Sequence, residues 1–208
     1  MLDDGFQHRA LRRDLDIVLV AAERWQGNRR MLPRGPWREP PRAICRATHV
    51  VVTRKVAPPE VAAGVLADIA ELGFVGDGSI VSFSPAGLTG IGAVASQVER
   101  PAWLRGRRVL AISSLADPVP FLAQLRSLGA EVESMVFPDH HEFSPDDLRA
   151  IAGRVASGTA IMTRKEAVKL RNGWPVDLVG FVLDQTVTME TGLPELDEAM
   201  ARALGGDS

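Results

Sequence analysis

Three clusters of polar residues have the types and spacing that chemistry requires: Asp3-Asp4-Gly5-Phe6-Gln7-His8, then Asp139-His140-His141, and then Thr163 with Lys165 and Lys169. Paired carboxylates commonly hold Mg²⁺ in enzymes that handle phosphates. A histidine beside an acid can transfer a proton near neutral pH or bind a metal. A helix N-terminus with nearby lysines attracts phosphate. Each cluster also has a purely structural interpretation: a solvated chain end, a capping loop and a charged surface helix.

Alternating strands and helices are expected to position these clusters. Apolar runs predict strands at 14–22, 48–53, 107–113, 131–137, 160–163 and 178–183, with weaker ones at 79–84 and 93–98 around a Gly-rich turn. Helix signals cover 58–72, 118–128, 144–157, 165–170 and 194–204. We expect the run 14–22 to be a buried parallel strand. The alternation predicts an α/β fold with parallel sheets, whose ligands bind at the carboxyl ends of strands.

The second and third clusters follow predicted strands and therefore fit this ligand-binding position. Asp3 and Asp4 are preceded only by Met1 and Leu2, so no strand within the sequence leads into them. The segment 24–46 is rich in Pro, Gly and Arg, and its prolines forbid a continuous helix. We predict a structured loop there, with a short helix over 41–47.

Composition and charge exclude several classes of protein. The chain has 208 residues, of which 46% are hydrophobic, and its net charge is −2. That composition excludes disorder, and the longest apolar runs are too short to span a membrane. The single cysteine, Cys45, excludes an internal disulfide. Residues 1–46 carry ten Arg against six acids, whereas residues 47–208 have a net charge of −6. The basic part suits an anionic ligand or membrane surface, or is simply a solvated face.

Five segments together resemble the tetraacyldisaccharide 4′-kinases of lipid A biosynthesis. DDGFQH at 3–8 resembles the family's most specific motif, and GNRRMLPRGP at 27–36 is similar to its GNG-x-LLPAGP segment. REP at 38–40 and LGA with FPDHH at 128–141 match further segments, and TRKEAVKL at 163–170 is similar to TEKDAVKL. The order and spacing agree over nearly the whole chain.

The resemblance implies a kinase that transfers the γ-phosphoryl group of ATP to the 4′-hydroxyl of an acylated glucosamine disaccharide 1-phosphate. It implies that Asp3 and Asp4 hold Mg²⁺ and that Asp4 and His140 are catalytic. It also implies two sets of binding residues. The substrate is expected to contact Gln7, His8, Arg38 and Glu39, and ATP, as cofactor, is expected to contact Thr163, Lys165 and Lys169. Such chemistry depends on positioning and charge stabilisation. The family works at the cytoplasmic face of the bacterial inner membrane, so peripheral contact with an anionic membrane surface is expected.

The resemblance also implies two domains, with a partial P-loop-type parallel sheet at 1–78, a β hinge at 79–105 and a second α/β domain at 106–208. Closure across the hinge would bring His140 toward Asp3 and Asp4. Family members carry a P-loop before DDGFQH, and the pattern GxxxxGK[ST] does not occur in these 208 residues. We therefore expect these residues alone to bind ATP weakly and not to phosphorylate lipid.

Two other classes of function remain as alternatives. Asp139-His140-His141 spells the DHH motif of a superfamily of metal-dependent phosphoesterases, but Asp14 and Asp16 precede their strand instead of following it. The second alternative is a non-catalytic remnant that binds a partner or a lipid surface. No nucleic-acid partner is expected, because the Arg-rich loop lacks interleaved aromatics apart from Trp25 and Trp37. Those two Trp more plausibly pack the loop or lie at a membrane interface.

Overall fold

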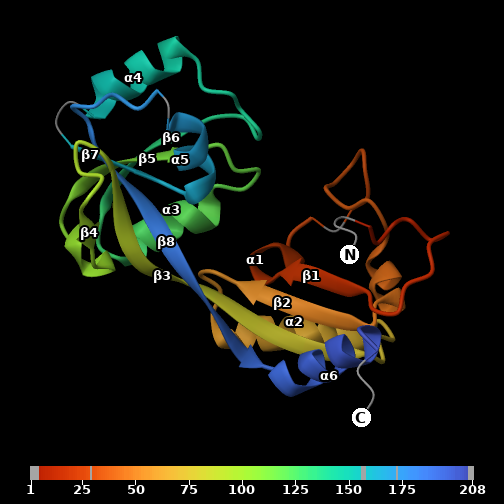
Figure 1. Cartoon of the computed structure of the whole chain (residues 1–208). Coiled ribbons are helices and arrows are strands. Elements are labelled where there is room, and N and C mark those ends of the chain that lie inside the picture. Colours follow the sequence, from red (N-terminus) through yellow and green to blue (C-terminus); the bar gives the residue numbers. More distant parts are fainter. Residues whose placement is uncertain (1–4, 29, 156–157, 172, 206–208) are drawn as a thin grey trace. The chain divides into compact units, whose positions relative to one another are not determined.

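The computed structural model describes residues 5–28, 30–155, 158–171 and 173–205. The chain divides into two compact units (Figure 1). Unit 1 comprises residues 1–83 and 187–208, and unit 2 comprises residues 84–186. Two long strands, β3 (Asp77–Gly92) and β8 (Val179–Thr191), each continue from one unit into the other. The α/β class is confirmed.

The division differs from the one expected from sequence at the C-terminus. Helix α6 (Leu193–Ala203) belongs to unit 1, whereas we had assigned residues 106–208 to the second domain. The reason is that β8 runs on for 13 residues and its end is held within unit 1. The Ser79 hydroxyl donates to the Gly192 carbonyl at 2.8 Å, and Arg54 forms an ion pair with Glu190.

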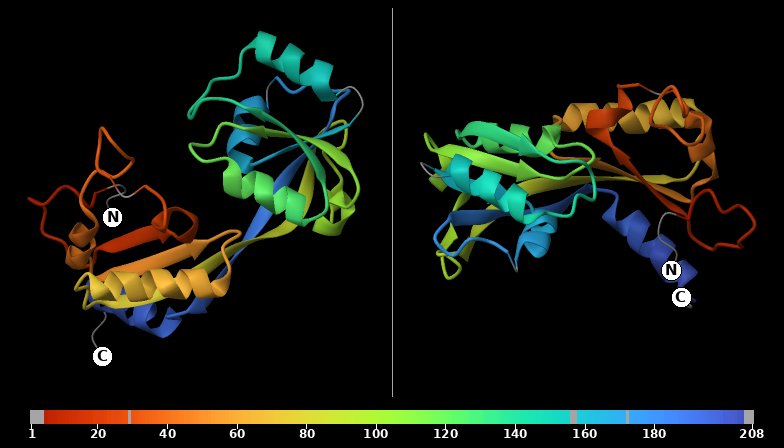
Figure 2. Two further views of the ribbon diagram at one scale, coloured as in Figure 1. Left: turned by 180° about the vertical axis from the view of Figure 1, so that it is seen from behind. Right: turned by 90° about the horizontal axis from the view of Figure 1, so that it is seen from above.

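Unit 1 is a parallel sheet with a helix on each face. Strand β1 (Ile17–Ala21) pairs with β2 (His49–Arg54), and β2 pairs with the first part of β3. Helices α2 (Pro59–Glu71) and α6 lie on opposite faces of this sheet (Figure 2). The one-turn helix α1 (Ala22–Trp25) precedes the Arg-rich loop, and the 3₁₀ helix η1 (Pro41–Arg46) follows it. Helix η1 corresponds to the short helix predicted over 41–47.

The sequence explains why α2 forms and where it ends. Pro59 occupies the first helical turn, where its missing N–H costs nothing. Ala62, Val65 and Ile69 recur at helical spacing and are fully buried against the sheet. Gly73, with φ of +100°, ends the helix in the left-handed conformation that glycine adopts without strain. This helix therefore fixes the strand-to-helix connection that follows β2.

The prediction that 14–22 is a buried strand was wrong in its burial, although the strand exists and is parallel. Val18 and Val20 pack against the core of unit 1, whereas Ile17 is 40% exposed and Leu19 68% exposed. Within the described residues β1 pairs only with β2, at the end of the strand order. Alternate side chains of a strand point to opposite faces, so one face of β1 remains open.

In unit 2 the strand order is β3-β8-β7-β5-β6, in which β8, β7, β5 and β6 are parallel, and β4 pairs antiparallel with β3. The further elements of unit 2 are β4 (Val98–Glu99), η2 (Pro101–Leu104), β5 (Arg108–Ser113), α3 (Val119–Ser127), β6 (Glu131–Val136), α4 (Pro145–Val155), β7 (Thr159–Met162) and α5 (Arg164–Leu170). The predicted parallel crossover from β5 through α3 to β6 is confirmed.

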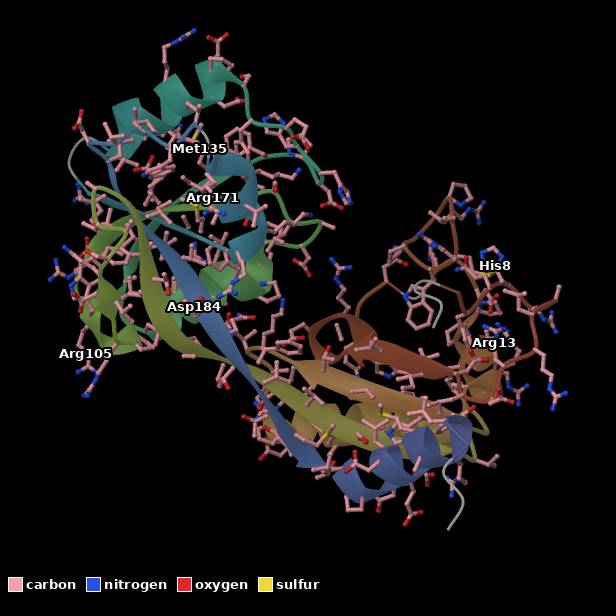
Figure 3. All side chains as sticks on the ribbon, viewed as in Figure 1. His8, Arg13, Arg105, Met135, Arg171 and Asp184 are labelled. Carbon is pink, nitrogen blue, oxygen red and sulfur yellow. The ribbon has the colours of Figure 1, made fainter. Side chains whose placement is uncertain are left out.

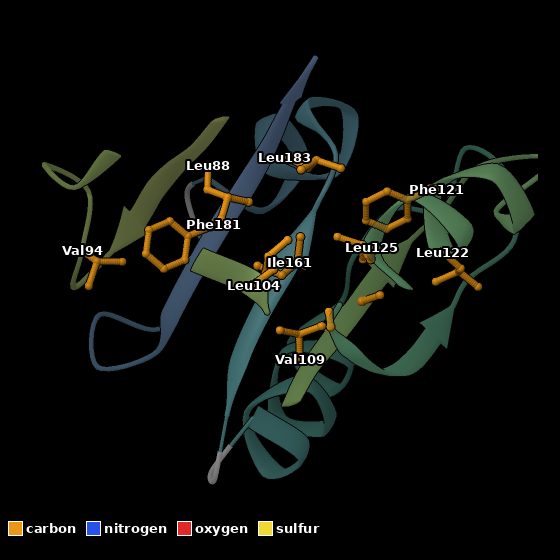
Figure 4. Packing of buried hydrophobic residues seen from close by; sticks show 12 residues of the cluster. Leu88, Val94, Leu104, Val109, Phe121, Leu122, Leu125, Ile161, Phe181 and Leu183 are labelled. Carbon is orange, nitrogen blue, oxygen red and sulfur yellow. The ribbon is translucent and has the colours of Figure 1, made fainter. Parts of the chain in front are cut away.

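Period-two alternation in β5 builds two cores, one on each face of the unit 2 sheet. Val109 and Ala111 join the core that contains Phe121 and Leu125 of α3 (Figure 4). Leu110 and Ile112 join the core that contains α4 and α5 residues instead. Because both faces are covered, the strand reads as a continuous apolar run. The sheet is thus held rigidly from both sides, and its strand ends are fixed.

The Gly-rich turn expected within 79–98 is instead part of β3. Residues 87–92 lie in the strand, and Leu88 pairs with Glu99 of β4. The chain turns only after Gly92 and folds back so closely that a Cβ at Gly90 would lie 1.8 Å from the Val94 carbonyl oxygen. The glycines here permit close backbone approach within a sheet, which sequence patterns do not distinguish from a turn.

Candidate functional site

The predicted site residues fall into three groups. Asp3 and Asp4 lie outside the described residues. Gln7, His8, Arg38 and Glu39 belong to unit 1, whereas His140, Thr163, Lys165 and Lys169 belong to unit 2. The expected approach of His140 to the opening acids stays a prediction, and each unit is described by itself below.

In unit 2, the second and third clusters meet at one edge of the sheet. Strands β5, β6 and β7 are parallel, and in their register Ser113 lies opposite Val136 while Ile112 lies opposite Met162. The segments that follow these strands, at 114–118, 137–143 and 163–170, therefore begin side by side. This confirms the expectation that both clusters lie at the carboxyl ends of strands.

The two lysines of α5 hold the loop that carries the histidines. Lys165 Nζ lies 2.6 Å from Asp139 Oδ1 and donates to the Ser114 carbonyl at 3.3 Å. This hydrogen bond from Lys165 lowers the pKa of Asp139. Lys169 Nζ donates to the His141 carbonyl at 2.8 Å and contacts Glu142 at 3.1 Å. One helical turn separates the lysines, so both reach the same loop.

The two histidines have different environments. His140 adopts a φ of +59°, a conformation that costs energy for a side chain with a Cβ, and its imidazole is 83% exposed. Its backbone N–H donates to Asp139 Oδ1 at 3.0 Å. Such strain clusters at functional sites. His141 instead packs between rings, stacked 4.7 Å from Phe137 and edge-on to Phe143. His140 is therefore the histidine that the loop presents to solvent.

His141 is fixed by an acid in the first turn of α4. Its Nε2 lies 2.9 Å from Asp147 Oδ2. Asp147 also accepts hydrogen bonds from the Ser144 backbone N–H and hydroxyl, at 2.8 and 2.7 Å. These bonds from Ser144, with the one from His141, lower the pKa of Asp147 to about 2. The carboxylate thus stays charged at neutral pH and joins the histidine loop to the predicted N-cap of α4.

Glu166 accepts four hydrogen bonds from two segments of unit 2, a role that the sequence analysis did not predict. Its side chain is fully buried, and Oε1 accepts from the Ser114 N–H at 2.8 Å and from the Ser114 hydroxyl at 2.9 Å. Oε2 accepts from the Thr163 N–H and hydroxyl. One carboxylate therefore joins the ends of β5 and β7 to the start of α5. The signal in the sequence was the capping box, Thr followed three residues later by Glu.

In unit 1, the opening motif and the REP segment are joined through Arg46. Arg46 Nη2 lies 2.6 Å from Glu39 Oε2, and its guanidinium stacks over the Phe6 ring at 4.5 Å. Gln7, His8 and Arg38 are exposed. Figure 3 shows His8 and Arg13 on the N-terminal loop of unit 1. The structure thus brings Phe6 and Glu39 to one arginine, while the other three predicted substrate contacts are exposed.

A second acidic group, Glu23, occupies the carboxyl end of the unit 1 sheet. Its Oε1 accepts three backbone N–H bonds, from Lys55 at 2.6 Å, Val56 at 3.0 Å and Ala57 at 3.2 Å. Burial acts to raise the pKa of Glu23, but the hydrogen bonds outweigh it and the pKa is lowered. No sequence pattern indicates this contact, because Glu23 and Lys55 meet only through the pairing of β1 with β2.

The described residues contain no group of three or more His, Cys, Asp or Glu that could hold a metal ion. Asp139 is engaged by Lys165, and His141 by Asp147, so these residues do not form the metal pair that a DHH phosphoesterase needs. In the same part of the chain, no helix is both long and apolar enough to cross a bilayer.

Comparison with known proteins points to one family throughout. The family model for tetraacyldisaccharide-1-P 4′-kinase, LpxK, matches residues 1–204. The tetraacyldisaccharide 4′-kinase of Anaeromyxobacter sp. (strain Fw109-5) is 42% identical over 210 residues, and that of Anaeromyxobacter dehalogenans (strain 2CP-C) is 45% identical over 178 residues. These matches cover 97% and 82% of this chain, respectively, and 56% and 46% of the relatives.

A solved structure agrees with these relatives. The crystal structure of "apo" form LpxK from Aquifex aeolicus in complex with ATP matches with a TM-score of 0.59 and 29% sequence identity. The match covers 97% of this chain and 56% of that one. The chain therefore spans about half the length of the proteins it matches. With a family model that matches nearly every residue and relatives above 40% identity, this chain belongs to the tetraacyldisaccharide 4′-kinase family.

Proposed function

We propose that this chain provides the part of a lipid A 4′-kinase that runs from the acidic motif to the C-terminal helix. The reaction is transfer of the ATP γ-phosphoryl group to the 4′-hydroxyl of tetraacyldisaccharide 1-phosphate. The observation that carries the proposal is the family match over residues 1–204, which includes all five motifs that resemble the family. The relatives are tetraacyldisaccharide 4′-kinases, and the similar crystal structure is a complex with ATP.

The loop at 139–141 supports a role for His140 in catalysis. The strained, exposed conformation of His140 is maintained by bonds on both sides, from Lys165 to Asp139 and from Lys169 to His141. A general acid or base must be accessible to the reacting groups and held in place. His140 meets both conditions, whereas His141 is committed to Asp147 and to aromatic packing. We assign the catalytic role to His140 for this reason.

The remaining roles follow from residue chemistry. Two adjacent carboxylates suit Mg²⁺, which prefers oxygen ligands, so Asp3 and Asp4 are the proposed metal ligands, with Asp4 also catalytic. When bound, Mg²⁺ would neutralise charge on the ATP phosphates. Gln7, His8, Arg38 and Glu39 are proposed to contact the disaccharide phosphate or sugar. Thr163, Lys165 and Lys169 are proposed to contact ATP phosphates. Each lysine ammonium has three N–H donors and uses two of them on its present partners, so it can contact a phosphate while it still holds the loop.

The location proposed for this protein is the cytoplasmic face of the bacterial inner membrane, in peripheral contact with its anionic surface. The substrate carries four acyl chains and two sugars, so it resides in a bilayer. Residues 1–46 carry ten Arg against six acids, which supports this contact because basic segments are attracted to anionic lipid.

The test is a chimera in which this chain replaces the matched half of the kinase of Anaeromyxobacter sp. (strain Fw109-5). We expect the chimera to transfer phosphate from labelled ATP to tetraacyldisaccharide 1-phosphate dispersed in detergent. His140→Ala in the chimera should lower kcat at least about a hundredfold, the usual range for a lost general acid or base. His141→Gln should lower activity less, and mainly through thermal stability.

The alternatives have their own readouts. A chimera that folds, by circular dichroism, yet transfers no phosphate contradicts the proposal and favours a non-catalytic remnant. Mn²⁺-dependent hydrolysis of a phosphodiester by the unmodified chain would instead support the phosphoesterase alternative.

A further inference from the structure

A loop in unit 1 exposes two large apolar side chains among arginines. We call residues 30–37 the Met31 loop. Met31 is 49% exposed and Leu32 is 63% exposed, and the side chains of Arg30 and Arg34 are exposed beside them. The segment 27–38 contains four Arg and no acid. The loop extends away from the sheet of unit 1 (Figure 1 and the left view of Figure 2).

The exposure of Met31 and Leu32 belongs to an organised loop. Leu32 N–H donates to the Trp37 carbonyl at 2.8 Å, and Trp37 N–H donates to the Arg30 carbonyl at 3.3 Å. Gly35 N–H donates to the Met31 carbonyl at 3.1 Å. A Cβ on Gly35 would lie 2.1 Å from the Arg30 carbonyl oxygen, so the turn closes as tightly as glycine permits. The loop is therefore shaped before any partner arrives.

The base of the loop is anchored in the core of unit 1. The Trp37 ring packs 5.6 Å from that of Trp25, which is only 1% exposed. Trp25 Nε1 in turn donates to Asp68 of α2 at 2.7 Å. The aromatic residue of the loop is thus partly buried against the core, while Met31 and Leu32 are exposed. The loop therefore presents two adjacent exposed apolar side chains next to exposed arginines, from a base that packs on the core of unit 1.

The pairing of a convex apolar tip with cations identifies the occupant. A projecting tip cannot enclose a small ligand, but it can enter the boundary between lipid headgroups and acyl chains. There, aliphatic side chains leave water while arginines meet lipid phosphates. Absence of acids from the segment 27–38 removes repulsion from an anionic surface. The charge and shape together fit an anionic bilayer.

We propose that the Met31 loop docks the protein on an anionic bilayer by inserting Met31 and Leu32, with Arg30 and Arg34 on the lipid phosphates. This inference deepens the proposed function, because it assigns one loop the task of bringing the chain to the membrane that holds its substrate. Docking needs neither ATP nor the disaccharide, so it can be measured separately from phosphate transfer.

The experiment is sedimentation of the purified 208-residue chain with vesicles. One set contains phosphatidylglycerol and phosphatidylcholine in equal parts, and the other contains phosphatidylcholine alone. We expect binding to the anionic vesicles that weakens with added salt. The double variant Met31→Ser/Leu32→Ser should bind at least about tenfold more weakly. Arg30→Gln/Arg34→Gln should weaken binding about twentyfold or more, at roughly fivefold for each arginine.

Matched controls change the same kinds of residue elsewhere. Val75 and Val176 are 96% and 75% exposed, so Val75→Ser/Val176→Ser removes apolar surface outside the loop. Arg105→Gln/Arg108→Gln removes two exposed arginines of unit 2. Both control variants should bind as the unsubstituted chain does. Near-ultraviolet circular dichroism of the Trp residues checks that each variant keeps its fold.

Two results would overturn the proposal: no binding of the unsubstituted chain to anionic vesicles, or equal binding by the Met31→Ser/Leu32→Ser variant and its apolar control. The phosphate-transfer assay uses substrate in detergent and contains no bilayer. An active chimera together with a chain that does not bind vesicles would therefore contradict only the proposal that the Met31 loop docks on a bilayer. Vesicle binding that depends on the Met31 loop, together with an inactive chimera, would contradict only the proposed kinase function.

Discussion

Replacing Glu166 by Gln removes one acceptor oxygen while keeping the size of the side chain. In the structure each carboxylate oxygen accepts one backbone N–H and one hydroxyl, from Ser114 on one side and from Thr163 on the other. The amide NH₂ of Gln is best placed toward Thr163, whose hydroxyl can rotate to accept from it. The Thr163 backbone N–H cannot rotate and is left without an acceptor.

The expected loss follows from this count. An unsatisfied buried donor costs about 1–3 kcal/mol, so Glu166→Gln should lower the free energy of unfolding by about 2 kcal/mol. Glu166→Ala deprives all four donors of their acceptor and should cost about 4 kcal/mol or more. The control is Glu131→Gln, whose side chain is 67% exposed in β6 and should change stability by less than about 0.5 kcal/mol.

Equilibrium urea unfolding provides the measurement, followed by circular dichroism and by the fluorescence of Trp103 and Trp174 in unit 2. Hydrogen exchange at Ser114 and Thr163 should accelerate in the Glu166→Gln variant, because their N–H groups are the bonded ones. If Glu166→Gln unfolds at the same urea concentration as Glu131→Gln, Glu166 does not hold these strand ends together and the reasoning is refuted.

Three further predictions concern pH. Burial lowers the pKa of His49 despite the nearby carboxylates of Asp77 and Glu195. Unit 1 should therefore lose stability as the pH falls below about 6.5, the pKa of histidine in the unfolded chain. In a plot of the urea midpoint against pH, the His49→Gln variant should lose less stability over this range. Glu23, whose pKa is lowered by three backbone N–H groups, should stabilise unit 1 above about pH 4.3 and lose that contribution on further acidification; Glu23→Ala should cost about 1–2 kcal/mol at pH ~7 and little in acid, measured by the same method. With a pKa of about 2, Asp147 should contribute fully above pH ~3.9 and lose its contribution toward pH 2, so Asp147→Asn should remove acid sensitivity in this range; unchanged acid unfolding of unit 2 would contradict it.

The elements between residues 107 and 170 could be predicted within a few residues because their signals are local. Helix α4 begins as Ser144 and the following proline indicate, and α3 is followed by Gly129 with φ of +85°. The meeting of the loops at 137–143 and 163–170 also followed from sequence, since parallel strands bring their carboxyl ends to one edge. These predictions needed only periodicity, capping residues and strand direction.

Other features depended on contacts between residues far apart in the chain. Which face of β1 is covered depends on the elements that pack over it from elsewhere in the chain, and no pattern within Ile17–Ala21 records that. The return of α6 to unit 1 depends on bonds across more than a hundred residues, from Ser79 to Gly192 and from Arg54 to Glu190. Local signals cannot reveal such pairings.

The family can be recognised from the residue order, because five motifs from DDGFQH to TRKEAVKL together have its order and spacing. The division of labour within the site came from three-dimensional packing. His140 and His141 are identical and adjacent in sequence, yet one is strained and exposed while the other is stacked on Phe137 and bonded to Asp147. Lysines suited to phosphate were found holding a loop, because a side chain's task depends on which groups the fold brings within hydrogen-bonding distance.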